Sequence, residues 1–484
     1  MSDAVRKPLV EPLDEHNGRL LAQVHPDNWR NPDPAPIYDL VVIGGGTAGL
    51  VCAAGAAGLG ARVALVERAL LGGDCLNTGC VPSKALLRSA RAVHEARAAA
   101  AVGVRTTVEV DFAAVMTRVR ARRADIAHND SAARLASLGI DLFLGQASFA
   151  GTRAVKVDGR TLRFGRAVIA TGGRPSAPPI PALAGISYFT SETIFSLTTQ
   201  PTRMLVIGAG PIGCEMAQAF ALLGSRVTLV DSASRVLSGE DEDASRIIAT
   251  QLERDGVTIV TGVGGPEGPP LRDRLAAADV VLVATGRIPN VEGLNLEAAG
   301  VTAGPAGIHV DDRLRTSNPR VFAAGDVCSS FKFTHAADAA ARVVIQNALF
   351  FGRRRVSALI IPWCTYTYPE VAHVGVSSGQ AITIPLADVD RSVVDEETDG
   401  FVRIHHEQGR IIGATIVAPH AGELIGHVAD VMRRGGGAGD LSAVIFPYPT
   451  VAEALRKAGD TYRRQRLTPR IRRLLEYYFR LSRR

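Results

Sequence analysis

The 484-residue sequence predicts an α/β protein that contains two copies of one βαβ unit and a smaller α+β domain after them. Residues 40–67 (LVVIGGGTAGLVCAAGAAGLGARVALVE) align without a gap to residues 204–231 (MLVIGAGPIGCEMAQAFALLGSRVTLVD). Each copy has a buried strand, a glycine turn, a helix and a second strand that ends in an acidic residue, the pattern of a right-handed βαβ crossover. Strands that precede helices from about Ser357 onward predict the α+β domain.

The order of these elements predicts the domain boundaries. The segments 166–175 and 279–290 each carry an apolar strand that ends in Ala-Thr-Gly, and they would close the two folds. A Pro-rich joint (175–183) marks an interdomain crossing, and the strand VFAAGDV (321–327) would return the chain to the first fold. We predict an N-terminal extension (1–36), a first fold (37–175 and 291–356), a second fold (176–290), a C-terminal domain (357–460) and a basic tail (461–484).

Composition and patterning exclude several classes of protein. The apolar stretch 40–63 is as long as a membrane span, but its glycines and strand–turn–helix pattern argue against one. The polar, charged N-terminus lacks the apolar region of a secretion signal, so we expect a cytoplasmic protein. Six irregularly spaced cysteines are too few for a secreted disulfide framework. Any disulfide should therefore be catalytic.

The net charge of +6 is concentrated at the C-terminus. Residues 461–484 contain nine arginines and one glutamate, so the rest of the chain carries −2 and we expect no nucleic-acid partner. Apolar residues at helical spacing between these arginines predict an amphipathic helix; they are Ile471, Leu474, Leu475 and Tyr478. Such a helix could make weak contact with an anionic membrane surface, or it could pack on its own domain or a dimer mate.

The first glycine turn has the residues of a dinucleotide-binding fingerprint. Gly44, Gly46 and Gly49 form a G-x-G-x-x-G between strand and helix. The missing side chains permit the tight turn and let backbone N–H groups and the helix N-terminus face a pyrophosphate. Glu67 ends the second strand, where a carboxylate can accept hydrogen bonds from a ribose diol.

The second glycine turn repeats this arrangement with Gly208, Gly210, Gly213 and Asp231. A carboxylate at the position of Asp231 binds the 2′-hydroxyl of NAD(H) and repels the 2′-phosphate of NADP(H). We therefore expect NADH to be preferred over NADPH. Arg235 is the residue that could reverse this preference, because it could reach a phosphate.

Two cysteines lie between the two glycine motifs, in GGDCLNTGCVPSK (72–84). Cys75 and Cys80 precede an apparent helix start, and Lys84 adds a cation one turn after Cys80. A helix N-terminus and a nearby cation both lower a thiol pKa, which suits exchange chemistry. A zinc half-site is disfavoured because no second Cys or His pair stands at metal-ligand spacing, and two buried thiols remain the other alternative. We predict no resident metal.

The cysteine run, both nucleotide motifs and AAGDV closely resemble the flavoprotein disulfide reductases, which include dihydrolipoamide dehydrogenase, glutathione reductase and mercuric reductase. The resemblance covers roughly residues 38–460 and implies FAD on the first fold and NAD(P)H on the second. It implies that Glu67 binds the adenosine ribose and Asp326 the ribityl chain or pyrophosphate. It also implies that Cys80 abuts the flavin while Cys75 exchanges with substrate.

The same resemblance assigns further residues to the cofactors. Lys84 would lie near flavin N5 and pair with Glu215. His335 would sit on a helix near the flavin pyrimidine edge, although a helix-cap or core histidine explains it equally well. The remaining cofactor-binding assignments are Ala147, Thr171, Gly172 and Gly286.

One position departs from the disulfide-exchanging members of the family. Those enzymes use a His-Pro followed by a Glu as acid and base, whereas FPYPTVAE (446–453) has Tyr448 in place of the histidine and retains Glu453. A tyrosine pKa of about 10 makes a poor proton shuttle for dithiols at pH 7. This tyrosine is similar to mercuric reductase, as are the segments 188–195 and 365–375.

Other features depart from mercuric reductase. The chain shows neither the usual C-terminal cysteine pair nor an N-terminal C-x-x-C module, and Cys364 is interpreted as a core residue rather than a substitute ligand. Cys52, Cys214 and Cys328 are interpreted as packing residues. The segment 262–274 replaces a longer β-meander, so the second fold is expected to be abbreviated.

Together these observations predict a homodimer in which Tyr448 and Glu453 of one subunit reach the cysteine pair of the other. The expected activity is that of a mercuric-reductase-like NAD(P)H oxidoreductase that acts on Hg(II) or another soft or small-molecule acceptor. The alternatives are a dihydrolipoamide dehydrogenase type of disulfide reductase, an NADH-dependent quinone reductase brought to membranes by the tail, and a flavin-bearing redox sensor.

Overall fold

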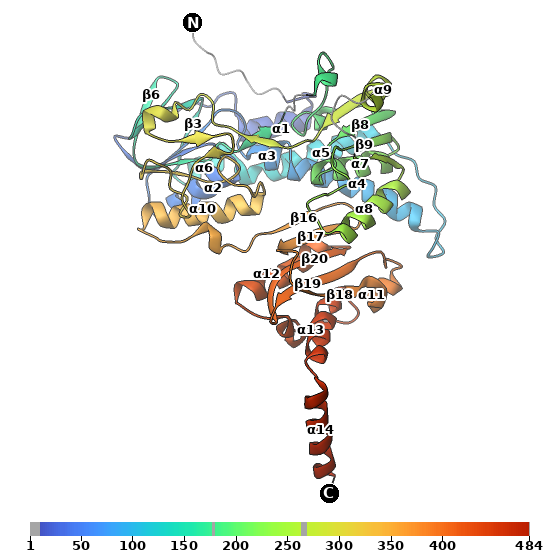
Figure 1. Ribbon diagram of the computed structural model, residues 1–484. Helices are drawn as coiled ribbons and strands as arrows, with labels where there is room; N and C mark the ends of the chain where they lie inside the picture. Colours follow the sequence, from blue (N-terminus) through green and yellow to red (C-terminus); the bar gives the residue numbers. More distant parts are fainter. Residues whose placement is uncertain (1–9, 177–179, 263–268, 484) are drawn as a thin grey trace. The chain divides into compact units, whose positions relative to one another are not determined.

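The computed structural model describes residues 10–176, 180–262 and 269–483 (Figure 1). The chain forms two compact units: Met1–Ser232 with Asp255–Leu359, and Ala233–Arg254 with Ile360–Arg484. None of the helices in the described part of the chain combines the length and the apolar character that crossing a bilayer requires. The apolar stretch 40–63 instead forms most of β1 (Tyr38–Ile43), a turn and the whole of α2 (Thr47–Gly58).

The first sheet of the first unit has seven strands in the order β3-β2-β1-β6-β5-β4, with β15 also paired to β6. Its parallel part is β3, β2, β1, β6 and β15, while β4 and β5 form an antiparallel meander with β6. The bounds are β1 (Tyr38–Ile43), β2 (Val63–Glu67), β3 (Asp141–Leu144), β4 (Ala147–Gly151), β5 (Ala154–Val157), β6 (Arg160–Ile169) and β15 (Val321–Ala323). The pairing of β15 returns residues 321–323 to the first fold, as the sequence predicts.

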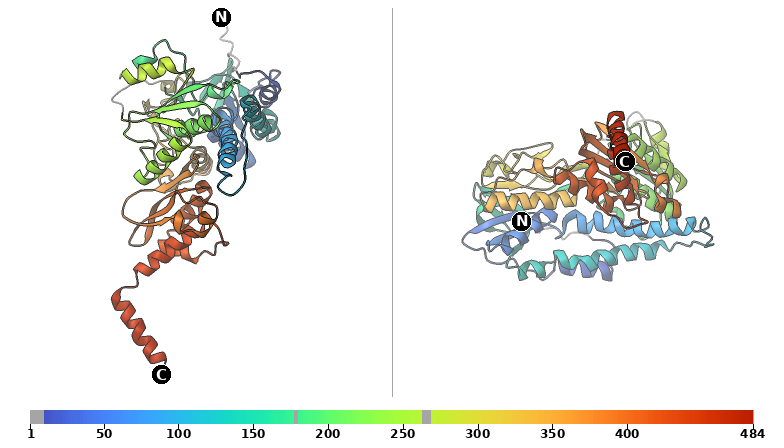
Figure 2. Two further views of the ribbon diagram at one scale, coloured as in Figure 1. Left: turned by 90° about the vertical axis from the view of Figure 1, so that its right-hand side faces the viewer. Right: turned by 90° about the horizontal axis from the view of Figure 1, so that it is seen from below.

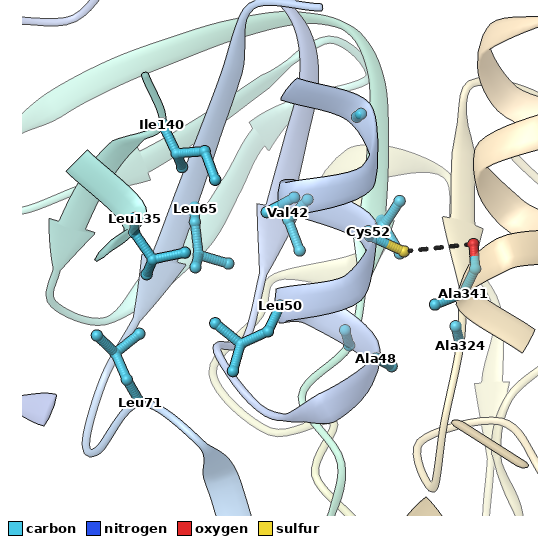
Figure 3. Close-up of a cluster of buried hydrophobic side chains, with 14 of the residues drawn as sticks. Val42, Ala48, Leu50, Cys52, Leu65, Leu71, Leu135, Ile140, Ala324 and Ala341 are labelled. Atoms are coloured by element: carbon cyan, nitrogen blue, oxygen red, sulfur yellow. Dashed lines mark hydrogen bonds between the residues drawn. The ribbon is translucent and has the colours of Figure 1, made fainter. Parts of the chain in front are cut away.

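Helix α2 (Thr47–Gly58) connects β1 to β2 and packs against α10 (Thr334–Leu349). Small residues permit this close approach, because a Cβ at Gly55 would lie 2.6 Å from Ile345 Cδ1. The side chain of Cys52 is fully buried there, and its Sγ lies 3.8 Å from the carbonyl oxygen of Ala341 (Figure 3). On the other side of α2, Leu50 and Leu71 belong to the same hydrophobic cluster.

The second fold has a four-stranded parallel sheet in the order β10-β9-β8-β11. Helix α7 (Pro211–Leu222) connects β8 to β9. The strands are β8 (Arg203–Ile207), β9 (Arg226–Val230), β10 (Val257–Val260) and β11 (Val280–Val283). Of the segment 262–274 that was expected to abbreviate this fold, residues 263–268 lie outside the described residues, as do 177–179 of the Pro-rich joint. Helix α9 (Pro269–Ala277) follows.

A layer of helices completes the first unit. Helices α4 and α5 pack side by side, drawn in blue and teal in the right-hand view of Figure 2. The helices are α1 (Glu15–Val24), α3 (Gly73–Asn77), α4 (Cys80–Ala98), α5 (Phe112–Ile126) and α6 (Ala132–Ser137). Two further strand pairs are β7 (Gly173–Pro175) with β12 (Arg287–Pro289), and β13 (Ala303–Gly304) with β14 (Gly307–Ile308).

The second unit contains a five-stranded antiparallel sheet in the order β16-β17-β20-β19-β18. Its strands are β16 (Pro362–Thr365), β17 (Glu370–Gly375), β18 (Gln380–Pro385), β19 (Phe401–Glu407) and β20 (Arg410–Ala418). Its helices are α8 (Glu242–Arg254), α11 (Asp390–Val394), α12 (Ala421–Arg433), α13 (Glu453–Gln465) and α14 (Pro469–Ser482). The predicted fold class, two Rossmann-like folds and a C-terminal α+β domain, is confirmed.

Candidate active site

The glycines of the first turn have no room for side chains. Gly44 has φ of 107°, and a Cβ there would lie 2.3 Å from the carbonyl oxygen of Ala170. A Cβ on Gly49 would lie 1.8 Å from the carbonyl oxygen of Gly44. Gly46 caps the N-terminus of α2, so the first N–H groups of the helix face outward from this turn. The backbone therefore forms a cradle suited to a pyrophosphate.

Glu67 is held in place by the backbone of the same turn. Its Oε2 accepts a hydrogen bond from Gly45 N at 2.5 Å, and its Oε1 accepts one from Ala69 N at 2.6 Å. Burial raises the pKa of Glu67 while these two hydrogen bonds oppose that rise. Both oxygens keep the carboxyl group aimed beside the glycine cradle.

A pocket brings four of the predicted cofactor residues together. Gly44, Glu67, Ala147 and Thr171 all line it. The other lining residues are Ile43, Val66, Arg68, Gly145, Gln146, Asn290, Glu292 and Leu294. A glycine cradle with a carboxylate at its edge fits the adenosine half of FAD. Gln146, Asn290 and Glu292 have no motif that could identify them in the sequence.

The two Ala-Thr-Gly segments lie directly against the glycine turns. Ala170 N donates to the carbonyl oxygen of Ile43, and Thr171 Oγ1 donates to that of Asn290 at 2.6 Å. In the second fold Ala284 N donates to the carbonyl oxygen of Ile207. Gly172 has φ of 66° and Gly286 has φ of 137°, so each segment ends in a conformation that favours glycine.

The second glycine turn has nearly the same backbone as the first. Gly208 has φ of 108°, and a Cβ on Gly213 would lie 1.7 Å from the carbonyl oxygen of Gly208. Gly210 caps α7. Asp231 follows β9, and its Oδ2 accepts a hydrogen bond from Ala209 N at 2.5 Å. This geometry places the carboxylate of Asp231 beside the turn, as the sequence predicts for a ribose-binding acid.

Arg235 belongs to the second unit and is engaged by its own loop. Its guanidinium donates hydrogen bonds to the carbonyl oxygens of Leu237, Ser238 and Glu240. These three contacts occupy both terminal nitrogens of the side chain. Arg235 is therefore held by hydrogen bonds within its own loop.

Cys75 and Cys80 lie on consecutive helices that meet at a tight turn. Cys75 is in α3, and Cys80 is the first residue of α4. Gly79 permits the turn, because a Cβ there would lie 3.0 Å from the carbonyl oxygen of Asp74. The hydrogen bond between the two thiols lowers the pKa of Cys80 and raises that of Cys75. Cys80 is thus the thiol that ionises first.

Thr334, which the sequence analysis did not identify, also contacts Cys80. Its Oγ1 lies 3.3 Å from Cys80 Sγ, at the start of α10. This contact and the positive charge of Lys84 further lower the pKa of Cys80. His335 follows in the first turn of α10 and stacks on Phe333 with ring centroids 5.6 Å apart. Thr334 directly precedes His335, a predicted cofactor residue. This position is the sequence signal that could have drawn attention to the threonine.

Lys84 and Glu215 form an ion pair, with 2.8 Å between Lys84 Nζ and Glu215 Oε2. Glu215 is 5% exposed and belongs to α7, so the pair joins the helix that follows Cys80 to the glycine helix of the second fold. The spacing in the sequence predicts neither residue's partner. It was the family resemblance that implied this pairing.

Asp326 follows β15, where its Oδ2 accepts a hydrogen bond from Arg287 Nε at 3.2 Å. Arg287 also bonds the carboxylate of Asp74 and the carbonyl oxygen of Gly173. Arg287 therefore connects a predicted flavin-binding acid to the residue that precedes Cys75. Sequence reasoning missed this role of Arg287, although it stands next to Gly286 in the second Ala-Thr-Gly segment.

Tyr448 and Glu453 lie in the second unit. Tyr448 is 72% exposed, and its hydroxyl donates a hydrogen bond to Asp390 Oδ2 at 3.1 Å, which raises the tyrosine pKa. Glu453 begins α13, is 8% exposed and accepts a hydrogen bond from Arg456. Their approach to the cysteine pair of a second subunit stays a prediction.

The other cysteines differ in burial. Cys52 and Cys214 are fully buried, which confirms their interpretation as packing residues. Cys328 is partly exposed, and burial of its thiol raises its pKa to about 12. Cys364 is also partly exposed, with its Sγ 3.9 Å from Glu370 Oε2. Among the described residues, no group of three or more His, Cys, Asp or Glu side chains is arranged to hold a metal ion.

Two family descriptions match the chain. Residues 38–341 match the pyridine nucleotide-disulphide oxidoreductases, and residues 361–459 match their dimerisation domain. A mercuric reductase of Bacillus cereus is 34% identical over 450 residues, which are 88% of this chain and 71% of the relative. A mercuric reductase of Streptomyces lividans is 37% identical over 464 residues (88% and 96%). A dihydrolipoyl dehydrogenase of Bacillus subtilis is 32% identical over 449 residues (87% and 97%).

Solved structures give the same result. The HOCl-induced flavoprotein disulfide reductase RclA of Escherichia coli has a TM-score of 0.76 at 28% identity, covering 87% of this chain and 99% of that one. LpdA of Mycobacterium tuberculosis has a TM-score of 0.78 at 26% identity, with the same coverage. The chain therefore belongs to the pyridine nucleotide-disulphide oxidoreductases, a family of flavoproteins that bind FAD and use NAD(P)H.

Proposed function

We propose that this oxidoreductase reduces a soft metal ion such as Hg(II), or a similar small acceptor, with NADH and the Cys75–Cys80 pair. The observation that carries the proposal is the pairing of two thiols on consecutive helices, with Thr334 in contact with Cys80. Two thiolates are good ligands for a soft cation. When bound, FAD supplies the two-electron chemistry between nicotinamide and the cysteines.

The protein's own residues would position FAD and stabilise the thiolate of Cys80. The glycine cradle and Glu67 would hold the adenosine half of FAD, and Asp326 would face its ribityl chain or pyrophosphate. Thr334 and Lys84 stabilise the thiolate of Cys80. The Lys84–Glu215 pair fixes α4 against α7, so the cysteine helix keeps its place beside the second fold.

The choice of a metal acceptor over a disulfide rests on Tyr448. Disulfide exchange needs a group that moves protons near neutral pH, and the hydrogen bond to Asp390 raises the pKa of Tyr448 further from that range. A metal acceptor is also supported by the relatives that are mercuric reductases. A solved Cu(II) complex of RclA shows that one structural neighbour binds a different metal ion.

The preference for NADH rests on Asp231 and Arg235. Asp231 presents a carboxylate beside the second glycine turn. Arg235, the one residue that the sequence suggested could favour a 2′-phosphate, is bound to three carbonyl oxygens of its own loop. We therefore propose that the 2′-hydroxyl of NADH is accepted and the 2′-phosphate of NADPH is repelled.

An acceptor panel tests the proposal directly. The purified, FAD-loaded protein would be assayed for NADH oxidation with Hg(II) plus excess thiol, Cu(II), lipoamide, glutathione disulfide and quinones. We expect Hg(II) to give the highest kcat/KM and Cys75→Ser and Cys80→Ser to abolish that activity. Faster turnover of lipoamide would instead establish the dihydrolipoamide dehydrogenase alternative, and full activity of both serine variants with quinones would establish the quinone reductase.

The dimerisation domain supports a homodimer. We propose in addition that Tyr448 and Glu453 act at the cysteine pair of the partner subunit. Mixing two inactive variants tests this arrangement, because Cys75→Ser and Glu453→Gln subunits would form heterodimers with one intact site. Recovery of about a quarter of the activity in an equal mixture is expected for a shared site, whereas no recovery is expected if each site lies within one subunit.

A second proposed function is contact with an anionic membrane surface through α14. Residues 463–483 are all exposed, and the arginines flank an apolar face. The exposed apolar residues of α14 are Ile471, Leu474, Leu475, Tyr477, Tyr478, Phe479 and Leu481. An amphipathic helix with this composition lies in the headgroup region, and its cations attract anionic lipid.

Liposome flotation tests the membrane proposal. We expect the dimer to float with vesicles that contain phosphatidylserine but not with pure phosphatidylcholine, and a variant without residues 461–484 to remain unbound. Leu474→Ser with Leu475→Ser removes apolar surface without changing charge and should weaken binding. Equal flotation with and without residues 461–484 would contradict the membrane proposal. Dissociation of the dimer in the truncated variant would also contradict it, because the tail would then act in the dimer contact.

A further inference from the structure

The segment before residue 38 lies outside the family match yet is integrated into the first fold. Helix α1 packs against α5 (Figure 1). Its Leu20 and Val24 are fully buried, and they join the hydrophobic cluster that contains Leu71 and Leu76. Leu71 precedes α3 and Leu76 lies within it. Residues of the N-terminal helix therefore share one hydrophobic cluster with residues of the helix that carries Cys75.

A buried arginine connects α1 to the turn between the two cysteines. Arg123 of α5 is 6% exposed. Its Nη2 donates to Asn17 Oδ1 of α1 at 2.5 Å, and its Nη1 donates to the carbonyl oxygen of Asn77 at 2.6 Å. Asn77 is the last residue of α3, two residues after Cys75 and three before Cys80. One guanidinium thus spans the N-terminal helix and the redox-active turn.

The other end of α3 is held by the same N-terminal segment. Leu71 N donates to the carbonyl oxygen of Val24 at 3.2 Å, and His25 Nδ1 lies 2.5 Å from the carbonyl oxygen of Ala69. Asn77 Nδ2 also donates to the carbonyl oxygen of Leu71 at 3.0 Å. Contacts with α1 and the residue after it therefore reach both the entry and the exit of the short helix that carries Cys75.

Asn17 is itself fixed before it meets Arg123. It is fully buried; its backbone N–H donates to Asp14 Oδ1, and its Nδ2 donates to the carbonyl oxygen of Pro12. Burial lowers the pKa of Arg123 to about 10, so its side chain still carries a positive charge at neutral pH. Removing a hydrogen-bond partner from a buried charge is strongly destabilising. The contacts with the Asn17 and Asn77 oxygens therefore restrain the Arg123 side chain.

We propose that the N-terminal segment 14–25 braces the redox-active turn and that Arg123, held by Asn17, is a positioning residue for the Cys75–Cys80 pair. The inference rests on the proposed redox role of these cysteines. Forming their S–S bond requires the two sulfur atoms to be held together, and a fixed turn raises the effective concentration of one thiol at the other. Loosening the turn should therefore disfavour the disulfide relative to the dithiol.

The test is a redox titration of the full-length, FAD-loaded protein against glutathione. Glutathione disulfide takes two electrons and two protons from the dithiol, giving two glutathione molecules and the Cys75–Cys80 disulfide. Thiol alkylation followed by mass spectrometry measures the fraction of disulfide. For Arg123→Gln we expect the disulfide to be destabilised by about tenfold, a shift of about 30 mV toward a more oxidising potential. Asn17→Ala should give a smaller shift in the same direction, and Asn17→Asp, which keeps an acceptor oxygen for Arg123 but loses the Nδ2 donor to Pro12, should lie between Asn17→Ala and the native protein.

Arg120→Gln is the matched control. Arg120 lies one turn earlier on α5 and is 5% exposed. It bonds Asp14 Oδ2 at 2.5 Å and Thr117 Oγ1 at 3.0 Å, and within the part of the chain that the structure describes it makes no hydrogen bond to α3. Because Arg120 reaches the brace only at Asp14, Arg120→Gln should reduce thermal stability as Arg123→Gln does but shift the potential by much less. An equal shift in both variants, or no shift in Arg123→Gln, would overturn the proposal. If Arg123→Gln does not fold, the potential of Asn17→Ala is compared with that of Arg120→Gln instead. An equal shift in these two variants, or no shift in Asn17→Ala, would then overturn the proposal.

Hydrogen exchange separates this inference from the proposed function. If the wild-type protein never forms the Cys75–Cys80 disulfide, the proposed redox role fails, and amide exchange in residues 71–80 then tests the brace alone. Faster exchange in Arg123→Gln than in Arg120→Gln would support the brace. Equal exchange in the two variants would remove it.

Discussion

The two glycine-rich folds have nearly the same turn but different surroundings. Gly44 and Gly208 have φ of 107° and 108°, and each lies against the carbonyl oxygen of an Ala-Thr-Gly alanine. The helix of the first turn, α2, is covered by α10, whereas α7 of the second is covered by α4. Helix α10 begins at Thr334, which contacts Cys80, and α4 begins at Cys80 itself.

The contrast shows that the glycine motif determines the turn, whereas the helix packed against it determines which other residues lie nearby. Each glycine turn forms a cradle suited to a pyrophosphate from its own backbone, packed against an Ala-Thr-Gly segment. The helices that cover the two turns begin at the same thiol, although their first residues are 254 positions apart in the chain. The two folds therefore differ in the elements packed on them, and those elements bring both folds near Cys80.

The largest expected effect would come from adding a side chain to one glycine turn at a time. Gly49→Ala and Gly213→Ala place a Cβ within 2 Å of a carbonyl oxygen in the first and second turn, respectively. At a cost of about 3 kcal/mol, each should weaken nucleotide binding by roughly a hundredfold. We expect Gly49→Ala to purify without FAD, and Gly213→Ala to keep FAD but lose NADH oxidation. Absorbance spectra and NADH titration measure the two effects; loss of FAD from both variants would contradict the separation of roles.

Breaking the ion pair between α4 and α7 should have the next largest effect. Lys84→Met removes the cation that pairs with the buried Glu215 carboxylate and should cost about 2 kcal/mol of unfolding free energy, reduced from the fully buried case because Lys84 is partly exposed. Adding Glu215→Gln should recover more than half of that loss. Urea unfolding of the two single variants and the double variant gives the coupling energy, and simple additivity would show that the pair does not hold the helices together.

The acid of the second fold should set nucleotide choice with a smaller effect. Asp231→Asn removes the charge that repels a 2′-phosphate, so the ratio of kcat/KM for NADH over NADPH should fall by about tenfold, the equivalent of 1.4 kcal/mol. Arg235→Gln is the control, because that side chain is bound to its own loop, and it should leave the ratio unchanged. A larger change in Arg235→Gln than in Asp231→Asn would assign specificity to the arginine.

The smallest expected effect concerns the hydroxyl of Thr334. The pKa of Cys80 is lowered, so its thiolate is present above that pKa and is lost as the pH falls through it. Thr334→Val removes one hydrogen bond to the thiolate and should move the midpoint upward by about half a pKa unit. Alkylation of Cys80 in the reduced protein, followed by mass spectrometry from pH 4 to 9, measures the midpoint. Thr334→Ser should keep the native midpoint; an unchanged midpoint in Thr334→Val would show that the hydroxyl does not act on Cys80.

Much of the fold and part of the site followed from the sequence. The repeat predicted both βαβ units, and the C-x4-C spacing identified Cys75 and Cys80, because these features depend on neighbours in the chain. Thr334, Arg287 and Arg123 were missed. Each acts through a contact more than 40 residues away, and none belongs to a local pattern.

By itself, the sequence determined the two glycine turns, the acids that end their second strands and the cysteine pair, since backbone conformation and residue spacing encode them locally. Only the tertiary structure decided that Lys84 meets Glu215, that Thr334 reaches Cys80 and that the N-terminal helix is bonded through Arg123 to the turn between the cysteines. The physical reason is that hydrogen bonds and ion pairs depend on distance in space, and packing brings together side chains that the order of residues leaves far apart.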